Sequence, residues 1–205
     1  MKTPEEILTS GPQTPADLCG PAAVIARIQC AKAARNTEGR PVKLLLHGEP
    51  GCGKSAICKL TAEALTPQFI TERISGQQLT ADGVREWIDH ARYIPTAWIV
   101  RIVEEVDLVS PQAEALLLQY LDVMPKQAAL LCTSNEKMGD LSNRFQSRFQ
   151  VIEVAPPTIA QLAQWLIGRW PDSAVECGEI AANNQGDVRA ALNDLQTHYD
   201  EKEFA

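Results

Sequence analysis

Residues 48–55 read GEPGCGKS and fit the pattern G-x-x-x-x-G-K-[ST], which cradles phosphate groups in proteins that use ATP or GTP. The apolar run VKLLLH at residues 42–47 precedes this segment and predicts a buried strand, and residues 56–65 follow it with good helix formers. The segment therefore lies between a strand and a helix, as the pattern requires. An ordinary glycine-rich turn is the alternative interpretation, but the flanking elements favour a nucleoside triphosphate site.

The residue types in this segment suit contact with phosphate. Glycine at positions 51 and 53 lets backbone N–H groups converge on phosphate oxygens, and the N-terminus of the following helix adds partial positive charge. We expect Lys54 to reach the β and γ phosphates and Ser55 to offer its hydroxyl to Mg²⁺. The predicted nucleotide-binding residues are Glu49, Pro50, Gly51, Cys52, Gly53, Lys54, Ser55 and Ala56.

The composition predicts a cytoplasmic globular protein. Of its 205 residues, 45% are hydrophobic, which is enough for a sizeable core. We expect no signal peptide, because residues 1–6 are not apolar, and no membrane span, because no apolar run approaches the required ~20 residues. The six cysteines form no C-x-x-C pair, which favours reduced thiols, with Cys52 filling space rather than acting in redox chemistry. The formal charge of −7 argues against a generally basic nucleic-acid-binding surface but leaves room for a local basic stripe.

Strands alternate with helices over the first three quarters of the chain. The patterns predict helices at residues 21–35, 79–93 and 111–124, and further strands at residues 69–75, 97–103, 128–135 and 149–154. This alternation predicts an α/β fold with a five-stranded parallel sheet covered by helices on both faces. Val24, Ile25 and Ile28 are expected to form the inner face of the first of these helices.

The two ends of the chain differ from this pattern. Residues 1–20 are rich in Pro, Thr and Gly, and residues 11–15 predict an extended arm. Beyond residue 155 strands disappear, and helices are expected near residues 158–170 and 174–183 and from Asp187, with a frayed, charged tail from Asp200. The sequence thus predicts an α/β nucleotide-binding core at residues 1–155 and a small helical lid domain at residues 156–205.

Polar side chains end two of the predicted strands. Glu104 and Glu105 follow the strand at 97–103, and Asn135 ends the strand at 128–135. Parallel α/β sheets bind ligands at the carboxyl ends of their strands, and hydrolysis of a γ-phosphate needs an acidic group near Mg²⁺ and a residue that orients water. Because side chains alternate along a strand, the two glutamates are expected on opposite sides, one for the metal shell and one for water. A solvated acidic turn is the alternative for the glutamates, and a Ser-Asn turn for Asn135.

Two arginines suit phosphate chemistry. Arg148 opens the last predicted strand, one helical turn after Arg144, and either forms a solvated basic turn or reaches a neighbouring subunit's phosphate. Arg189 lies in the first turn of a predicted helix, where the helix dipole disfavours a cation. A phosphate partner would explain that placement, and a surface arginine is the alternative.

The order of these motifs resembles that of AAA+ ATPases, and among them the clamp-loader group typified by replication factor C small subunits. The resemblance runs from about Gly11 to Gln196. It is carried by segments similar to Walker A (48–55), Walker B (VEEVD, 103–107), sensor 1 (CTSN, 132–135), the Ser-Arg-Cys box (QSRF, 146–149), the sensor 2 helix (186–196) and the segment that faces DNA in clamp loaders (79–91).

The resemblance implies ATP and Mg²⁺ as cofactors and a role for each candidate. Glu105 would polarise the attacking water, which Asn135 would position, and Glu104 would join Ser55 in binding Mg²⁺. Arg189 would sense the γ-phosphate from the lid. Arg148 would complete the site of a neighbouring AAA+ subunit, which implies a homo- or hetero-oligomer.

Three features depart from the family's pattern. Glu104 stands where Asp is usual, so turnover is expected to be slow or the metal shell adjusted. Residues 11–14 (GPQT) lack the arginine and lysine of the usual Arg-Pro-Lys-Thr, and we expect no counterpart of the clamp-loader collar after the lid.

The expected function is an ATPase that acts as an oligomeric assembly factor on DNA-replication or other DNA-bound machinery. DNA and a sliding clamp are the expected partners, besides neighbouring subunits. One alternative is a nucleotide-switched interaction module with little hydrolysis, and another is a protein remodeller unrelated to DNA.

Overall fold

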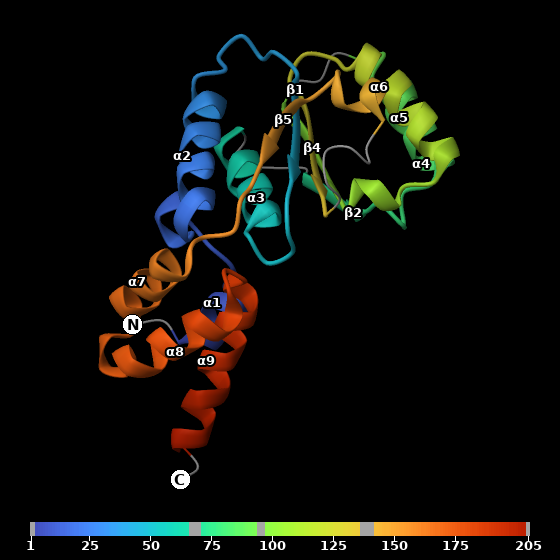
Figure 1. Ribbon diagram of the computed structural model, residues 1–205. Coiled ribbons are helices and arrows are strands. Elements are labelled where there is room, and N and C mark those ends of the chain that lie inside the picture. Colours follow the sequence, from blue (N-terminus) through green and yellow to red (C-terminus); the bar gives the residue numbers. More distant parts are fainter. Residues whose placement is uncertain (1–2, 66–70, 94–96, 136–141, 204–205) are drawn as a thin grey trace. The chain divides into compact units, whose positions relative to one another are not determined.

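A computed structural model describes residues 3–65, 71–93, 97–135 and 142–203 of the chain (Figure 1). The chain divides into two compact units, and each is described by itself. Unit 1 consists of residues 1–27, 49–60 and 154–205, and unit 2 of residues 28–48 and 61–153. The division into a core at 1–155 and a lid at 156–205 stays a prediction.

Unit 2 is built on a five-stranded parallel sheet in the order β2-β3-β4-β1-β5. The strands are β1 (Val42–His47), β2 (Thr71–Ser75), β3 (Ile99–Glu104), β4 (Ala128–Ser134) and β5 (Gln150–Glu153). This confirms the predicted sheet, although the part of the predicted second strand before residue 71 lies outside the described residues. Because the strands are parallel, their carboxyl ends all lie at one edge of the sheet and their amino ends at the other.

One face of this sheet is covered by α4 (Ala81–His90), α5 (Pro111–Val123) and the short α6 (Asn143–Gln146), as Figure 1 shows. Thr80 and Ser110 start the two longer helices by accepting hydrogen bonds from the backbone N–H groups of Gly83 and Ala113. The helices bury their apolar faces against β1, β3 and β4 in a core that includes Leu45, Val84, Trp87, Val103, Leu117, Tyr120, Leu121 and Leu130. The helices predicted at residues 79–93 and 111–124 are confirmed, the first of them over a shorter range.

A buried arginine fixes β3 to these two helices. Arg101 is 6% exposed, and its guanidinium carbon lies 4.7 Å from the ring centre of Trp87 on α4 and 5.4 Å from that of Tyr120 on α5. Its Nη1 donates to the Tyr120 hydroxyl at 2.7 Å, and its Nε lies 3.2 Å from a Glu72 carboxylate oxygen on β2. The strand that ends at Glu104 is therefore held from both its neighbouring strand and its covering helices.

Unit 1 is helical. It contains α1 (Pro4–Ser10), η1 (Pro15–Asp17), α7 (Ile159–Arg169), η3 (Pro171–Ser173), α8 (Ala174–Asn184) and α9 (Val188–Glu203). The first parts of α2 (Gly20–Ala34) and α3 (Lys54–Leu65) also belong to it. Its core joins α7, α8 and α9 through Leu162, Leu166, Trp170, Cys177, Ala181, Ala191, Leu192 and Leu195. No helix in the described part of the chain is long and apolar enough to cross a membrane.

Both ends of the chain contain more helix than predicted. The prediction for residues 1–20 missed α1, which begins with a capping box: Thr3 accepts from the Glu6 backbone, and the Glu6 carboxylate accepts from the Thr3 backbone. At the other end, α9 continues to Glu203, so the tail predicted to fray from Asp200 is helical as far as that residue.

The predicted inner face of α2 is wrong at Val24 and Ile28, whereas Ile25 is half-buried. Val24 and Ile28 are 52% and 48% exposed, whereas the alanines Ala22, Ala26 and Ala33 are buried. Alanine has no side chain beyond Cβ, so an alanine face lets a helix approach its neighbours more closely than a face of branched residues does. The buried face of α2 is formed mainly by small residues, although Gln29 is buried as well.

Candidate functional site

The segment GEPGCGKS ends in a tight turn that opens α3. Gly51 and Gly53 have φ values of 76° and 99°, in the left-handed region that favours glycine. A Cβ at Gly53 would lie only 3.3 Å from the Ala22 side chain, so bulk is excluded there as well. Lys54 and Ser55 are the first two residues of the 12-residue helix. Unpaired N–H groups of a helix's first turn, together with its dipole, form an anion-binding end.

Lys54 is held against its own loop. Its side chain is buried, and Nζ donates a 2.7 Å hydrogen bond to the Glu49 carbonyl oxygen. Cys52, two residues earlier, is 1% exposed, and burial raises the pKa of its thiol despite the nearby Lys54 ammonium. A buried thiol with a raised pKa stays protonated near neutrality, which supports the space-filling role predicted for Cys52.

An acidic side chain lies against the same turn. A Cβ added at Gly51 would collide with the Asp187 carboxylate. Asp187 also accepts a 3.0 Å hydrogen bond from the Ala190 backbone N–H, so it caps the start of α9. Arg189, two residues further on, is exposed and makes no side-chain hydrogen bond or ion pair with the described residues. Sequence reasoning placed the helix start at Asp187 and singled out Arg189, but it did not predict that the Asp187 carboxylate lies against the turn at Gly51.

In unit 2, Glu105 and Asn135 meet where β3 and β4 end. Asn135 Nδ2 donates to Glu105 Oε1 at 3.1 Å, and the Glu105 backbone N–H donates to Thr133 Oγ1 at 3.2 Å. The Asn135 backbone N–H also donates to a carboxylate oxygen of Asp107 at 3.3 Å. The structure thus brings together the residues predicted to polarise and to position water.

Glu105 leaves the strand geometry. Its φ and ψ are 53° and 55°, a left-handed conformation that is uncommon for a residue with a side chain. The Gly76 backbone N–H donates to the Glu104 carbonyl, and a Cβ at Gly76 would collide with the Glu105 carbonyl. The two glutamates were predicted to diverge through strand alternation. They do have different partners, but the reason is that the strand ends at Glu104 and the backbone turns at Glu105.

Glu104 is paired with an arginine of the neighbouring strand. Arg73 on β2 donates from Nε and Nη2 to the two Glu104 carboxylate oxygens at 2.9 and 2.8 Å. The Glu104 side chain is 25% exposed and that of Arg73 56%. This two-pronged geometry is the strong form of an arginine–carboxylate contact. The predicted metal ligand is therefore also an arginine's partner, which sequence reasoning missed.

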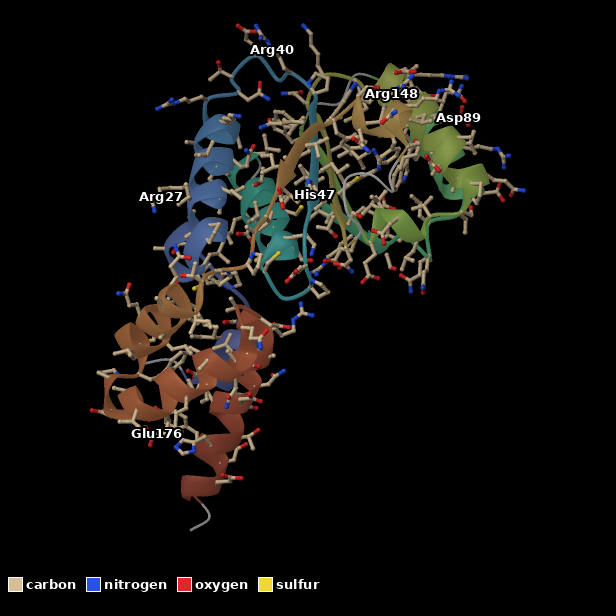
Figure 2. The ribbon with its side chains drawn as sticks, viewed as in Figure 1. Arg27, Arg40, His47, Asp89, Arg148 and Glu176 are labelled. Carbon is tan, nitrogen blue, oxygen red and sulfur yellow. The ribbon has the colours of Figure 1, made fainter. Side chains whose placement is uncertain are left out.

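Arg148 lies at the opposite edge of the sheet. It lies two residues before β5, at the amino end of that strand, whereas Glu104 and Asn135 are at the carboxyl ends of β3 and β4. Figure 2 accordingly shows Arg148 near the start of β1 and His47 at that strand's far end.

The guanidinium of Arg148 is held within unit 2. Nε and Nη2 donate to the two Asp122 carboxylate oxygens at 2.8 and 2.9 Å, and Nη1 donates to the Arg144 carbonyl. The hydrogen bonds from Arg148 hold the pKa of Asp122 below its usual value. Asp122 was not predicted as a partner, because its place at the end of α5 gives no local signal.

The segment GEPGCGKS follows β1, an inner strand of a parallel sheet, and its glycine turn opens a helix. Glu105 and Asn135 lie where two further strands of that sheet end. This combination defines a P-loop nucleotide-binding protein. The family model for AAA, "ATPase family associated with various cellular activities", matches residues 44–157. The chain belongs to this family.

The chain is also similar to clamp-loader proteins. It is 27% identical over 168 residues to the replication factor C large subunit of Aeropyrum pernix, covering 74% of this chain and 34% of the relative. The large subunit of Thermofilum pendens is 26% identical over 178 residues, covering 78% and 42%. This chain therefore spans about a third of the length of the first of these relatives.

Solved structures share the fold. A point mutant of Thermotoga maritima RuvB superposes with a TM-score of 0.74 at 20% identity and covers 92% of this chain and 65% of that one. The structure titled as the RuvB Holliday junction branch migration motor of the same organism has a TM-score of 0.69 at 20% identity, covering 89% and 62%.

Proposed function

We propose that this chain binds ATP with Mg²⁺ and hydrolyses it at interfaces with neighbouring AAA subunits. The single observation that carries the proposal is the separation within unit 2 of two kinds of residue. Glu105 contacts Asn135 at the carboxyl edge of the sheet, whereas Arg148 lies at the amino edge. In this proposal, Glu105 accepts a proton from water that Asn135 orients, and Arg148 stabilises charge on a neighbour's nucleotide.

The phosphates would be held by residues 49–56, with Lys54 as the cation and Arg189 reaching the γ-phosphate. Ser55 and Glu104 would hold Mg²⁺, which supplies positive charge to the phosphates when bound. These two residues carry oxygen ligands of the kind that Mg²⁺ prefers. The described residues contain no group of three His, Cys, Asp or Glu side chains that could cage a metal alone. That composition fits Mg²⁺, which is usually bound through one or two protein groups plus substrate phosphates.

The class of partner that we propose is inferred from the proteins to which this chain is similar. Their names, replication factor C and a Holliday junction branch migration motor, belong to proteins that act on DNA. We infer an assembly factor on DNA-replication or other DNA-bound machinery, with a sliding clamp as one candidate partner. A remodeller unrelated to DNA is the competing assignment, and phosphate release measured with and without duplex DNA separates the two.

The proposed shared site predicts nucleotide-dependent assembly. Sedimentation or mass photometry with a non-hydrolysable ATP analogue and Mg²⁺ should show oligomers that are reduced or lost without nucleotide. The reason is that each nucleotide would be contacted from two subunits, so its binding free energy would be linked to association. The Lys54→Ala variant should stay monomeric under the same conditions. A wild-type chain that remains monomeric with saturating analogue would contradict the subunit-interface site.

A nucleotide-switched module with little hydrolysis is the second candidate, and the Arg73–Glu104 pair favours it. Arg73 already satisfies both Glu104 oxygens and neutralises the carboxylate, so Mg²⁺ would have to compete with a guanidinium. Strong competition would leave nucleotide bound but turned over slowly.

Replacing Arg73 tests this competition. Arg73→Met should lower the Mg²⁺ concentration for half-maximal tightening of ADP binding by about tenfold, which corresponds to about 1.4 kcal/mol. Titration calorimetry of ADP over a Mg²⁺ series measures this without relying on turnover. Arg85→Met, which removes an exposed arginine paired with Asp82 on α4, is the matched control. An unchanged Mg²⁺ dependence in Arg73→Met would show that the arginine does not compete with the metal.

A further inference from the structure

A pocket of about 730 Å³ lies in unit 2 at the edge of the sheet where β1 begins. Its walls come from the end of α2, the connection at residues 36–41, the start of β1, Thr61 of α3 and the residues around Arg148. Figure 2 shows Arg40 and Arg148 at this end of unit 2 and His47 at the other end of β1. The volume is in the range of pockets that bind small ligands. The candidate residues Glu104, Glu105 and Asn135 are not part of its lining.

The lining is strongly cationic in an acidic chain. It contains Lys32, Arg35, Arg40, Lys43 and Arg148, whereas Glu38 is the one carboxylate among the lining residues. Glu38 is already paired with Arg40 at 2.7 Å, and the whole chain has a formal charge of −7. Asp122, just outside the lining, pairs with Arg148. Cations from several elements still outnumber the carboxylates at this pocket.

The helix dipole accounts for the position of only two of these cations. Lys32 and Arg35 lie one turn apart at the C-terminal end of α2, where cations are favoured. Neither has an ion-pair partner in the described ranges, so the two like charges stay uncompensated. Arg40, Lys43 and Arg148 come from other elements and owe nothing to this dipole. Arg40 and Arg148 are paired with Glu38 and Asp122. A bound anion would therefore chiefly offset the repulsion between Lys32 and Arg35.

The wall that carries Arg40 is held in place. Asn36 brackets the backbone of Arg40, donating from Nδ2 to its carbonyl at 2.8 Å and accepting from its N–H at 3.0 Å. The Gly39 carbonyl accepts a 2.7 Å hydrogen bond from the Gln127 N–H, and Gly39 has a φ of 64°. Because the turn is fixed at both ends, the backbone of Arg40 would lose little conformational entropy when a ligand binds.

The chemistry of the lining points to phosphate rather than to a base or an apolar ligand. Guanidinium and ammonium groups match phosphate oxygens. Among the described residues that line the pocket there is no aromatic side chain on which a base could stack. We propose that this basic pocket binds a run of phosphate groups through contacts that do not read bases. The backbone of a nucleic-acid duplex and a free polyphosphate share this chemistry.

Charge reversal at Lys32 and Arg35 tests the proposal, because neither residue belongs to the proposed ATP site. Binding of a fluorescent 20-bp duplex and of tripolyphosphate is measured without nucleotide over a salt series. Lys32→Glu and Arg35→Glu should each weaken binding about tenfold, and each should reduce the duplex salt slope by about 0.9 if one phosphate contact is lost. Arg27→Glu is the matched control: Arg27 is an exposed arginine of α2 outside the lining, and the substitution changes the net charge equally (Figure 2). Arg35→Lys should retain most of the affinity, and thermal melts check that each variant folds.

The two ligands separate the sources of phosphate. Pocket-dependent binding of the duplex, with tripolyphosphate failing to compete at equal phosphate concentration, assigns the site to a nucleic-acid backbone. Tight, pocket-dependent binding of tripolyphosphate assigns it to a free polyphosphate, since binding at the loop around Lys54 would not respond to Lys32→Glu. Equal effects of Arg27→Glu and Lys32→Glu, or no effect of the pocket variants on either ligand, would overturn the proposal.

Discussion

Glu105→Gln is expected to lower the kcat of ATP hydrolysis by about 10²–10⁴-fold, the usual contribution of a general base. Glutamine keeps the size of the side chain and an oxygen that can accept from Asn135 Nδ2, which lies 3.1 Å from Glu105 Oε1. It cannot take a proton from water, so the chemical step should fail while the turn at the end of β3 stays formed. Steady-state phosphate release and nucleotide affinity, measured on the same samples, check both expectations.

The control for this prediction is the affinity of the variant for ATP. ATP affinity should change little in Glu105→Gln, because the residue is proposed to act on water and not on the nucleotide. Asn135→Ala should also lower turnover, but less, because water would lose its orientation while the base remains. If Glu105→Gln hydrolyses ATP at the wild-type rate, or if the wild-type chain shows no turnover with or without DNA, the chain is better described as a nucleotide switch.

Arg148→Ala is expected to lower turnover by about 10³–10⁵-fold, the range found for arginines that reach a transferring phosphate. The loss should occur although Arg148 lies at the edge of the sheet opposite to Glu105 in its own chain. Asp122→Asn, which removes the charge of the partner that Arg148 contacts, serves as a comparison. It should change turnover far less, because the arginine itself is retained. Phosphate release at high protein concentration gives the rates.

Mixing two inactive variants shows which chain uses Arg148. Arg148→Ala keeps its own nucleotide residues, and Lys54→Ala keeps its arginine. A mixture should therefore recover part of the wild-type turnover if the arginine of one chain serves the nucleotide of another. Recovery should rise with protein concentration. A mixture as inactive as its components would place Arg148 in a structural role, supported by its contact with Asp122.

The sequence predicted the sheet well, because its signals are local. Residues 42–47 and 128–134 are predominantly apolar runs, and they form β1 and β4, which pair with each other inside the sheet. The inner face of α2 could not be read in the same way, since Val24 and Ile28 are more apolar than the alanines that are buried instead. The helix α1 was missed because the proline and threonine content of residues 1–20 indicated an extended segment, although the sequence also contains a capping box.

The same distinction between local and distant signals applies to the candidate site. The positions of Lys54, Glu105 and Asn135 follow from strands that end beside them. The contacts of site residues with distant segments do not follow from these signals. Arg73 contacts Glu104 because β2 pairs with β3, and neither segment alone predicts this strand order. The left-handed backbone of Glu105 depends likewise on Gly76, whose missing side chain leaves room for it. Contacts between segments distant in the sequence cannot be read from either segment alone.

The placement of Glu105 and Arg148 at opposite edges of one sheet also restricts symmetry. If both act on the same nucleotide, the surface that offers the arginine cannot be the surface that receives it. Association would then be heterologous, one chain's front against the next chain's back, and a twofold dimer would not provide this contact. Such a contact repeats until rotation closes a ring or, if it does not close, extends into a helical filament. A closed assembly would keep every site complete, whereas an open one would leave a single arginine at one end and a single unfinished nucleotide site at the other.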